Sequence, residues 1–482
     1  MTNKTIYWYD FETFGRNPRR DRASQFAGIR TDEDLNIIGD PLVMYCKPAA
    51  DFLPDPGACL ITGITPQQAL EKGLNEVEFI KNIHREFSEP GTCVAGYNSI
   101  RFDDELTRQL LYRNFYDPYE REWKNGNSRW DIIDMLRLCA ATRPEGISWP
   151  HKEDGSVSFR LDQLTVANGI EHSGAHDALA DVIATIEMAK LVKQAQPKLY
   201  DYIYQLRDKR RVQSEIDMVT RKPLLHVSMM YPAQLGCLAL VMPICVHPKN
   251  NNGVIVVDLR DDPTEWMSLS VEQIRERVYT PRVELEEEGL ERVPLKTVHI
   301  NKCPIITSPA VLSPAKAEEY AIDLEQCRRH WQMLQDDPML IKKVSAVFDA
   351  EPAMTETDPD FMIYSGGFFS DSDRSLMQTL RSTSPRDLGR LDLPFRDKRL
   401  GAMLLRYRGR NFPESLNPEE LQNWQKFCHA RVSEPAALTS FEMALTEARE
   451  QAREQGKAQG LAVLDAVEQY AIDLRKTTAS AT

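Results

Sequence analysis

The sequence lacks the features that mark secreted, membrane-spanning and zinc-ribbon proteins. Its nine cysteines are scattered over 482 residues with no C-x-x-C pair, so they predict reduced core thiols and no disulfide framework or zinc site. No stretch approaches the roughly 18 uninterrupted apolar residues of a membrane-spanning helix, and the N-terminal residues lack the long apolar segment of a signal peptide. Internal repeats and low-complexity tracts are also missing. We therefore expect a soluble, cytoplasmic protein that does not enter a membrane.

An excess of positive charge is lacking as well. The chain has 59 basic and 72 acidic residues, which gives a net charge of -13. This balance argues against broad, nonspecific adsorption to nucleic acid or to anionic membranes, although a local basic groove remains compatible with it. The length exceeds what one hydrophobic core usually serves, so we expect two or three domains.

Strand and helix patterns alternate from about residue 5 to residue 194. Three successive strands, a later apolar strand and intervening amphipathic helices predict a mixed sheet flanked by helices. The strands are expected at 5–10, 24–32, 41–48 and 92–98, and helices at 75–87, from 102, at 129–141, at 160–170 and at 176–194.

The pattern changes after a charged, helical connector at 198–215. Short β segments separated by Pro, Asn and Gly predict a small barrel or sandwich at 224–228, 237–246, 253–260 and 296–300. The acidic run at 283–291 is most simply a solvated loop or helix face. Helical patterns dominate from about Ser313 to the end, which predicts a helical C-terminal domain.

The stretch WYDFETFG, residues 8 to 15, places two carboxylates at the end of a short apolar strand. Asp10 and Glu12 are two residues apart, so they point to the same face of the strand. Two acids at positions that are partly buried are unfavourable unless a cation lies beside them. A divalent metal ion is the obvious candidate, whereas a lone D-x-E motif more often marks a strand that simply ends in solvent.

Two further stretches of the same region carry acids at helix starts. Asp103 begins a helix, where a carboxylate is favoured by the helix dipole and can also act as a plain N-cap. Asp177 opens a later helix, Asp181 follows one turn on, and His176 comes directly before them. Acids at i and i+4 repel each other on a helix, and a nearby metal ion or other cation would relieve that repulsion.

Together these side chains predict one chemistry. Asp10, Glu12, Asp103 and Asp181 supply four oxygen donors without thiolates, which is the set that Mg²⁺ and Mn²⁺ prefer. A pair of such ions about 3.5 to 4 Å apart suits phosphodiester hydrolysis by in-line displacement. His176 is suited to take the proton from the attacking water as general base.

The order of these motifs resembles a known family. D-F-E-T at 10–13, N-x-x-x-F-D at 98–103 and H-D-A-x-x-D at 176–181 resemble the DEDDh family of 3'-to-5' exonucleases. The H-x-x-x-x-D spacing matches its histidine branch. Further stretches, including QFAGIRTD, LITGITPQ, RNFYDPY, FRLDQLTVANGIEH and VHINKCP, closely resemble the bacterial exonuclease I family along the whole chain, most specifically in the first 195 residues.

This resemblance implies an α/β protein with a ribonuclease H-like exonuclease domain at 1–195, an SH3-like β domain at 196–350 and an α-helical domain at 351–482. It implies a processive 3'-to-5' exonuclease that degrades single-stranded DNA to 5'-mononucleotides, with a role in DNA repair and recombination. Two Mg²⁺ ions, which Mn²⁺ should be able to replace, would be held by Asp10, Glu12 and Asp181 at the first site, with Asp103 completing the second.

Several residues are expected to contact the DNA. Arg160 matches a family position that contacts substrate near the scissile phosphate, and Glu12 with the backbone around Phe11 and Thr13 is placed to meet the terminal nucleotide. Single strands are held by cationic tracks and aromatic platforms, which are interleaved between residues 101 and 143. From that stretch and the motif before it we select Asn98, Arg108, Tyr119 and Trp123, although salt-bridged amphipathic helices would produce the same pattern.

Other expectations concern the surroundings of the site. Arg16, Arg19, Arg20 and Arg22 form a dense basic stretch that could steer a phosphate backbone or merely keep a loop soluble. The two additional domains would lengthen the groove and hold the strand between cuts. The resemblance further implies a monomer that docks the acidic C-terminal tail of single-stranded DNA-binding protein. An RNA-trimming exoribonuclease and a noncatalytic single-strand-binding scaffold are the alternative functions.

Overall fold

The computed structural model describes residues 4–172, 177–350, 356–456 and 458–479. By spatial clustering the chain forms two compact units. The first unit combines residues 1–128, 173–185 and 353–482, and the second combines residues 129–172 and 186–352. The helical C-terminal segment therefore belongs to the same unit as the first strands, although more than 200 residues separate them in the sequence.

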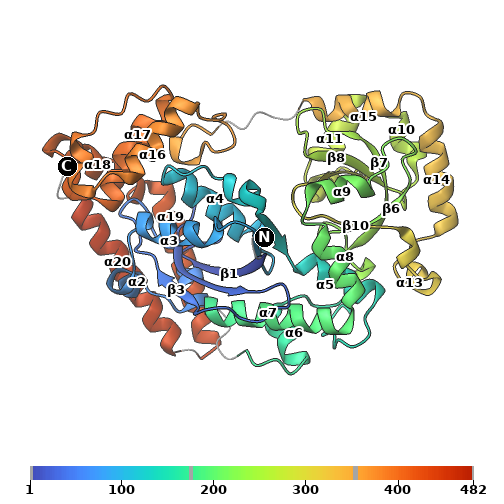
Figure 1. Cartoon of the computed structure of the whole chain (residues 1–482), viewed down its shortest axis with the longest axis horizontal. Coiled ribbons are helices and arrows are strands. Elements are labelled where there is room, and N and C mark those ends of the chain that lie inside the picture. Colours follow the sequence, from blue (N-terminus) through green and yellow to red (C-terminus); the bar gives the residue numbers. More distant parts are fainter. Residues whose placement is uncertain (1–3, 173–176, 351–355, 457, 480–482) are drawn as a thin grey trace. The chain divides into compact units, whose positions relative to one another are not determined.

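The sheet of the first unit contains both strand orientations, as the sequence predicts (Figure 1). β1 pairs antiparallel with β2 and parallel with β4, while β2 pairs antiparallel with β3. The strand order is β3-β2-β1-β4, so β1 has a partner on each side. Its strands are β1 (Thr5–Thr13), β2 (Ala23–Thr31), β3 (Leu42–Tyr45) and β4 (Thr92–Gly96).

Two helices cover one face of this sheet. Phe26 from β2 and Tyr9 and Phe11 from β1 pack in one buried cluster with Phe79 of α3 and Leu106 of α4. Burial of a large apolar side chain contributes about 1.5 to 3 kcal/mol, so this cluster fixes β1 firmly against both helices. The helices of this part are α1 (Pro56–Thr62), α2 (Pro66–Lys72), α3 (Glu76–Phe87) and α4 (Asp103–Arg113).

The C-terminal helices share their core with this α/β part. Tyr112 and Phe115, at the end of α4, pack with Leu400 and Met403 of α17. On another side, Val467 of α20 belongs to a buried cluster with Phe14, the residue after β1, and Cys59 of α1. The helices of this segment are α16 (Asp371–Ser382), α17 (Lys398–Asn411), α18 (Pro418–Val432), α19 (Pro435–Glu454) and α20 (Ala458–Ala479).

The second unit contains a five-stranded sheet of antiparallel pairs. Its strand order is β10-β6-β7-β8-β9, and the register of β7 shifts between Pro243 and Cys245, where proline cannot donate a ladder hydrogen bond. The sequence predicts four of these strands but not β10. They are β6 (Leu224–Val227), β7 (Leu238–Val246), β8 (Gly253–Asp258), β9 (Leu295–His299) and β10 (Ile305–Thr307).

Several helices of the second unit, among them α10, α11, α14 and α15, lie around this sheet (Figure 1). The acidic run at 283–291 is helical over its first part, and Leu285 within it is buried, so one side of that helix contributes to the core. The helices are α5 (Ile133–Thr142), α6 (Leu161–Ala167), α8 (Pro197–Gln205), α9 (Lys209–Glu215), α10 (Pro263–Ser268), α11 (Val271–Tyr279), α12 (Arg282–Glu287), α13 (Pro314–Glu319), α14 (Leu324–Asp336) and α15 (Leu340–Asp349).

Two elements pass from one unit into the other. β5 (Ser128–Asp131) begins at the last residue of the first segment, and α7 (Ala178–Ala195) begins in the first unit and ends in the second. All nine cysteines are buried free thiols, which confirms the prediction of reduced core thiols. Among the described residues, no helix is both long enough and apolar enough to cross a membrane.

Candidate active site

Asp10 and Glu12 lie near the C-terminal end of β1, on the face opposite to Phe11. Phe11 is buried in the apolar cluster under α3 and α4, because alternate residues of a strand point to opposite faces. Asp10 pairs with Ala27 and Glu12 with Gln25 of β2, and the register shifts directly after Glu12. The strand is thus held in register up to the second acid, and the backbone leaves the regular ladder immediately beyond it.

Asp103 reaches the same strand from the first turn of α4. Its side chain is 5% exposed, and its Oδ1 accepts a hydrogen bond from the backbone N–H of Phe11 at 3.3 Å. The residue before it, Phe102, has no side chain that can cap the helix. The negative charge of Asp103 therefore lies where the helix dipole favours it and is tied to the segment between Asp10 and Glu12.

Asp181 comes from the first turn of α7. Asp177 caps this helix, since its Oδ1 accepts the backbone N–H groups of Leu179 at 3.1 Å and Ala180 at 3.3 Å. One carboxylate oxygen each from Asp10, Glu12 and Asp181 all lie within 4.8 Å of one another. We call these three residues together with Asp103 the acid cluster.

The acid cluster shifts the pKa values of its own members. Burial and then the charges of Asp103 and Glu12 hold the pKa of Asp10 well above its usual range. Burial, followed by the charges of Asp181 and Asp103, raises the pKa of Glu12 to about 9. For both groups, the charges that act on them from the described part of the chain are carboxylates. A nearby cation stabilises the charged form of such carboxylates and would lower their raised pKa values.

The donor set fits a divalent metal ion. Three carboxylate oxygens converge from β1 and α7, and hard oxygen ligands of this kind suit Mg²⁺, Mn²⁺ or Ca²⁺ better than thiolate-binding ions. The geometry that the sequence motifs predict, two acids on a strand end and one on a helix start, is therefore present. His176, the predicted general base, lies outside the described residues.

The comparisons with known proteins agree with this arrangement. Family models match residues 7–189 as an exonuclease, 207–350 as an exonuclease I SH3-like domain and 357–474 as an exonuclease I C-terminal domain. Exodeoxyribonuclease I of Escherichia coli is 47% identical over 472 residues, which cover 98% of each chain. This chain belongs to the exonuclease I family. The predicted fold class, an α/β exonuclease domain with an SH3-like and a helical domain, is confirmed.

Solved structures of the family superpose closely on this chain. A zinc-bound form of an E. coli exonuclease I complex with single-stranded DNA matches with a TM-score of 0.92 at 46% identity, covering 98% of this chain and all of the other. A structure of single-stranded DNA-binding protein with exonuclease I and an inhibitor matches with a TM-score of 0.91 at 45% identity and the same coverage. The similarity therefore extends over all predicted domains, while the predicted boundaries at 195 and 350 stay predictions.

In this member of the exonuclease I family, the residues predicted to meet the terminal nucleotide differ in burial and in the groups that are already hydrogen bonded. The Phe11 ring is part of the apolar core, so its backbone is the part that faces the acid cluster. Thr13 is buried, and its hydroxyl donates to the carbonyl of Gly15 at 2.5 Å. Asn98 lies between β4 and α4 with a left-handed backbone at φ 57°, a conformation that asparagine tolerates better than most residues.

The predicted residues on α4 and the following loop include a paired arginine, the half-buried Tyr119 and the exposed Trp123, and we call these two aromatic residues the aromatic surface. Arg108 is 6% exposed, and its guanidinium donates to both carboxylate oxygens of Glu122 at 2.7 and 2.9 Å. Its guanidinium also lies 5.3 Å from the centre of the Tyr119 ring. Trp123 is 65% exposed, so its indole is free to meet a base, whereas the charge of Arg108 is already compensated.

One aromatic side chain next to this surface was missed by the sequence reasoning. Phe368 is 83% exposed and packs edge-on against Tyr119, with ring centres 6.3 Å apart. It follows two glycines, Gly366 and Gly367, in a stretch that reads as an ordinary turn. The signal that could have found it is its neighbour Phe369, because two aromatics directly after a glycine pair are unusual for a plain solvent loop.

Three of the four arginines in the basic stretch after β1 form ion pairs within the protein. Arg22 is 3% exposed and lies 3.5 Å from Asp51 and 3.6 Å from Glu76. Arg20 pairs with Glu356, and Arg19 lies 3.6 Å from Glu105. Of the two interpretations of this stretch, backbone steering and a solubilising loop, Arg22 fits neither, because it is a buried structural cation.

Arg160, the predicted contact near the scissile phosphate, belongs to the second unit. It is the residue before α6, and its guanidinium forms a two-point ion pair with Asp162 at 2.9 and 3.1 Å. Its side chain is 65% exposed. An exposed guanidinium can exchange a surface carboxylate for a phosphate at little cost, since such surface pairs are worth at most about 1 kcal/mol.

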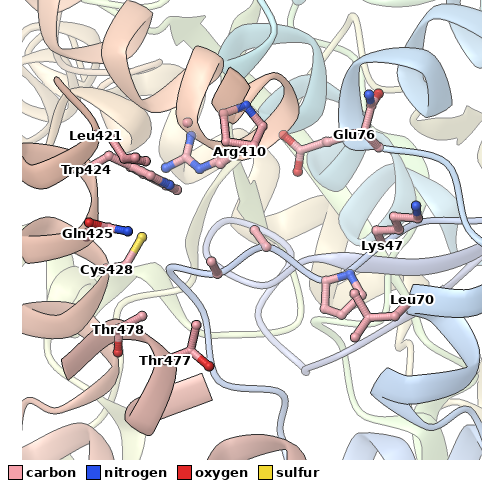
Figure 2. Close-up of a pocket in the computed structure, with 16 residues that line it drawn as sticks. Lys47, Leu70, Glu76, Arg410, Leu421, Trp424, Gln425, Cys428, Thr477 and Thr478 are labelled. Carbon is pink, nitrogen blue, oxygen red and sulfur yellow. The ribbon is translucent and has the colours of Figure 1, made fainter. Parts of the chain in front are cut away.

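A separate cavity of about 370 Å³ lies in the first unit between residues 47–50 and the helices α17, α18 and α20 (Figure 2). Its wall includes Glu76 and Arg410 but no member of the acid cluster. Both residues belong to a group of buried ion pairs that we call the ion-pair network. Its carboxylates are Asp51, Glu76 and Asp360, and its arginines are Arg22, Arg113 and Arg410.

Proposed function

We propose that this chain is a processive 3'-to-5' exonuclease that hydrolyses single-stranded DNA to 5'-mononucleotides. The observation that carries the proposal is the acid cluster, in which three carboxylates converge within 4.8 Å on a chain of the exonuclease I family. The solved E. coli exonuclease I complex with single-stranded DNA supports the substrate. A noncatalytic scaffold would not need four converging acids, two of them buried and two partly buried, because they cost stability when no cation is present.

The acid cluster would hold two divalent ions, for which we propose Mg²⁺. Asp10, Glu12 and Asp181 would hold the first ion, and Asp103 would complete the second site. Such ions, when bound, stabilise the attacking and leaving oxygens of an in-line displacement. The fixed position of β1 supports this role, because Asp103 is hydrogen bonded to the backbone between Asp10 and Glu12. His176 would accept a proton from the attacking water as general base.

The remaining predicted residues would hold the DNA strand. The backbone around Phe11 and Thr13, with Glu12, would meet the terminal nucleotide, and Asn98 would line the same region. Tyr119, Trp123 and Phe368 would stack on successive bases, since the exposed rings of Trp123 and Phe368 and the half-buried ring of Tyr119 each offer a flat apolar face. Arg108 would hold the Tyr119 ring in place and could bind a DNA phosphate that replaces Glu122 as its partner. Arg160 would bind the DNA backbone near the scissile phosphate.

The decisive experiment is timed product analysis on a single-stranded DNA oligomer labelled at its 5' end, in Mg²⁺. A ladder that shortens from the 3' end, with mononucleotides as the other product, is the expected result. Asp181→Ala should give no ladder while its circular dichroism spectrum stays that of the wild type. Shortening from the 5' end, internal cutting or retained turnover in Asp181→Ala would contradict the proposal.

A matched RNA oligomer in the same experiment distinguishes a DNA-degrading enzyme from an RNA-trimming enzyme. We expect the RNA to be digested far more slowly than the DNA. Processivity is tested with the full chain by adding an excess of unlabelled DNA after the enzyme has bound the labelled strand. Continued shortening of the labelled strand is expected, and arrest after one nucleotide would refute processivity.

We also propose that the chain binds the acidic C-terminal tail of single-stranded DNA-binding protein and works as a monomer in the cytoplasm, in repair and recombination. The solved structure of exonuclease I with single-stranded DNA-binding protein supports the partner. A peptide of the acidic tail, labelled with a fluorophore, should bind the chain in a salt-dependent way, because such contacts are electrostatic. A tail with its acids changed to amides is the control and should not bind.

A further inference from the structure

A second buried aspartate lies next to the acid cluster on α4. Asp104 follows Asp103 directly in the sequence and is 1% exposed. Its Oδ1 accepts a hydrogen bond from the hydroxyl of Tyr9 at 2.9 Å and one from Nη2 of Arg121 at 2.5 Å. Asp104 is thus a carboxylate whose partners are the side chains of Tyr9 and Arg121, whereas the side chain of its neighbour Asp103 accepts a hydrogen bond from the backbone of the strand that carries Asp10.

Arg121 reaches Asp104 from the short helix η2 (Glu120–Glu122). Its side chain is fully buried, and its guanidinium lies 5.1 Å from the centre of the Phe87 ring. Phe87 in turn packs edge-on against Tyr9 with ring centres 4.9 Å apart. Arg121 and Tyr9 therefore hold Asp104 from two sides, and an apolar ring closes the site around the charges.

The sequence neighbours of these residues explain what the arrangement can do. Tyr9 precedes Asp10 on β1, and Asp104 follows Asp103 on α4, so the Tyr9–Asp104 hydrogen bond joins the two backbones that carry acid-cluster members. Arg121 lies between Tyr119 and Trp123, two of the aromatic residues proposed to stack on DNA bases. The same contacts thus connect the acid cluster with the proposed aromatic surface.

We propose that Asp104, Arg121 and Tyr9 form a positioning unit that sets the Asp103 carboxylate against Asp10 and so adjusts the affinity of the acid cluster for divalent ions. The inference rests on the proposed function, because it assumes that the acid cluster binds metal. None of the three residues needs to touch metal or DNA. Tyr9 and Asp104 act through Asp10 and Asp103, the residues beside them in the sequence, and Arg121 acts through its ion pair with Asp104.

A merely structural role is the competing explanation, and the chain offers a matched control for it. At the other end of α4, roughly 15 Å along the helix, Arg113 forms an equally buried ion pair with Glu76 at 3.0 Å. Glu76 lines the cavity in Figure 2 and belongs to the ion-pair network. Loss of this pair removes the same kind of interaction from the same helix without touching a neighbour of the acid cluster.

The test measures Mn²⁺ binding by the rise in melting temperature of the full chain, which requires no turnover. The variants are Asp104→Asn, Tyr9→Phe and the control Glu76→Gln. For Asp104→Asn we expect the Mn²⁺ concentration at half-maximal stabilisation to rise about tenfold, the lower end of what loss of a group supporting a metal ligand usually costs. For Tyr9→Phe, which loses one hydroxyl, a rise of about threefold is expected.

The control fixes the interpretation. Glu76→Gln should lower the melting temperature without metal but leave the half-stabilising Mn²⁺ concentration within about twofold of the wild type. Equal weakening by Glu76→Gln and Asp104→Asn, or Mn²⁺ binding unchanged in both Asp104→Asn and Tyr9→Phe, would overturn the inference. Should Asp104→Asn fail to fold, Tyr9→Phe decides alone, and wild-type Mn²⁺ binding in that variant overturns the proposal.

The failure of the inference and of the proposed function look different. If the wild type is stabilised by Mn²⁺ and digests DNA while both variants bind Mn²⁺ like the wild type, the positioning unit alone is refuted. If Mn²⁺ does not stabilise the wild type and no DNA is digested, the proposed function falls, and the inference falls with it.

Discussion

The first unit buries two groups of carboxylates and treats them in opposite ways. In the acid cluster, burial and neighbouring carboxylates hold the pKa of Asp10 well above its usual range and raise that of Glu12 to about 9. In the ion-pair network, burial alone would also raise the pKa of Glu76, but Arg113 and Arg22 outweigh it and lower the pKa to about 2. Arg410 and Arg22 likewise outweigh burial at Asp51 and hold its pKa far below its usual value.

The difference separates acids that stabilise the fold from acids that we propose to bind metal. Where a carboxylate joins distant segments, the chain supplies arginines, as between Asp51 near β3 and Arg410 of α17. Where carboxylates converge from β1, α4 and α7, the main charges that act on Asp10 and Glu12 from the residues described in the structure are those of other carboxylates. The second arrangement costs stability by itself and becomes favourable with a cation taken from solution.

The sharpest way to break this comparison is Asp10→Asn. Hydrolysis should fall on the order of 10⁴-fold, because loss of one ligand removes several kcal/mol of transition-state stabilisation at about 1.4 kcal/mol per tenfold in rate. The metal-free fold should become more stable by about 1 kcal/mol, since one charge leaves a repelling group. Single-turnover digestion and urea unfolding in EDTA measure the two effects. A variant that loses stability together with activity would show that Asp10 serves the fold.

The converse change belongs to the ion-pair network. Asp51→Asn leaves Arg22 and Arg410 with less negative charge in a buried site, so the free energy of unfolding should fall by about 3 to 5 kcal/mol. Activity per folded molecule should stay near that of the wild type. Asp465→Asn is the control, because its ion pair with Arg449 is exposed and worth less than about 1 kcal/mol. Equal effects in both variants would remove the distinction between buried and exposed pairs.

The acid cluster could be predicted from the sequence and the ion-pair network could not, for a physical reason. The acid cluster was predictable because its members lie in short motifs, two residues apart on a strand or at helix starts, where spacing fixes the direction of the side chain. The ion-pair network was not, because Arg410 and Asp51 are 359 residues apart and nothing local marks them as partners. Arg22 illustrates the consequence, since it reads as part of a surface basic stretch but is buried.

The fold shows the same limit. Periodicity predicted most strands and the helical C-terminal part, because apolar spacing is a local property. It could not predict that this C-terminal part shares a core with α4, where Tyr112 of α4 and Leu400 of α17 belong to one buried cluster. The short β10 was missed because three residues carry too little pattern. The exonuclease domain expected at 1–195 therefore covers the sequence motifs, whereas the compact unit that carries the acid cluster also includes residues 353–482.

The pH dependence of stability should have opposite signs for the two groups. The pKa of Glu12 rises from 4.5 to about 9 on folding, so its contribution to metal-free stability is present below about pH 4.5 and is lost as the pH rises towards 9. For Glu76, with a pKa lowered to about 2, stability is present above pH 4.5 and is lost as the pH falls through 2.

The measurement is the melting temperature in EDTA between pH 5 and 9, compared for the wild type and Glu12→Gln. The melting temperature of the variant should rise steadily relative to that of the wild type as the pH increases. Saturating Mn²⁺ should reverse this difference, so that the wild type melts at the higher temperature. Parallel curves at every pH would mean that neither burial nor the neighbouring carboxylates raise the pKa of Glu12 in the folded protein.

The smallest effect tests where the acid cluster ends. Asp177 raises the pKa of both Asp10 and Glu12, but it is the last and weakest of the causes, and its exposed carboxylate caps α7. Asp177→Asn keeps a good N-cap residue and removes only a charge, so hydrolysis and Mn²⁺ binding should stay within about threefold of the wild type.

Asp181→Asn, one turn further along the same helix, is the matched comparison and should abolish hydrolysis. The two variants remove the same charge by the same chemical change at positions i and i+4. Any difference between their rates of hydrolysis therefore reflects the position of the acid and not its residue type. A hundredfold loss in Asp177→Asn would move the boundary of the acid cluster outward and make Asp177 a functional acid. Weak effects in both variants would instead remove α7 from the metal site, because its acids would then serve the helix start alone.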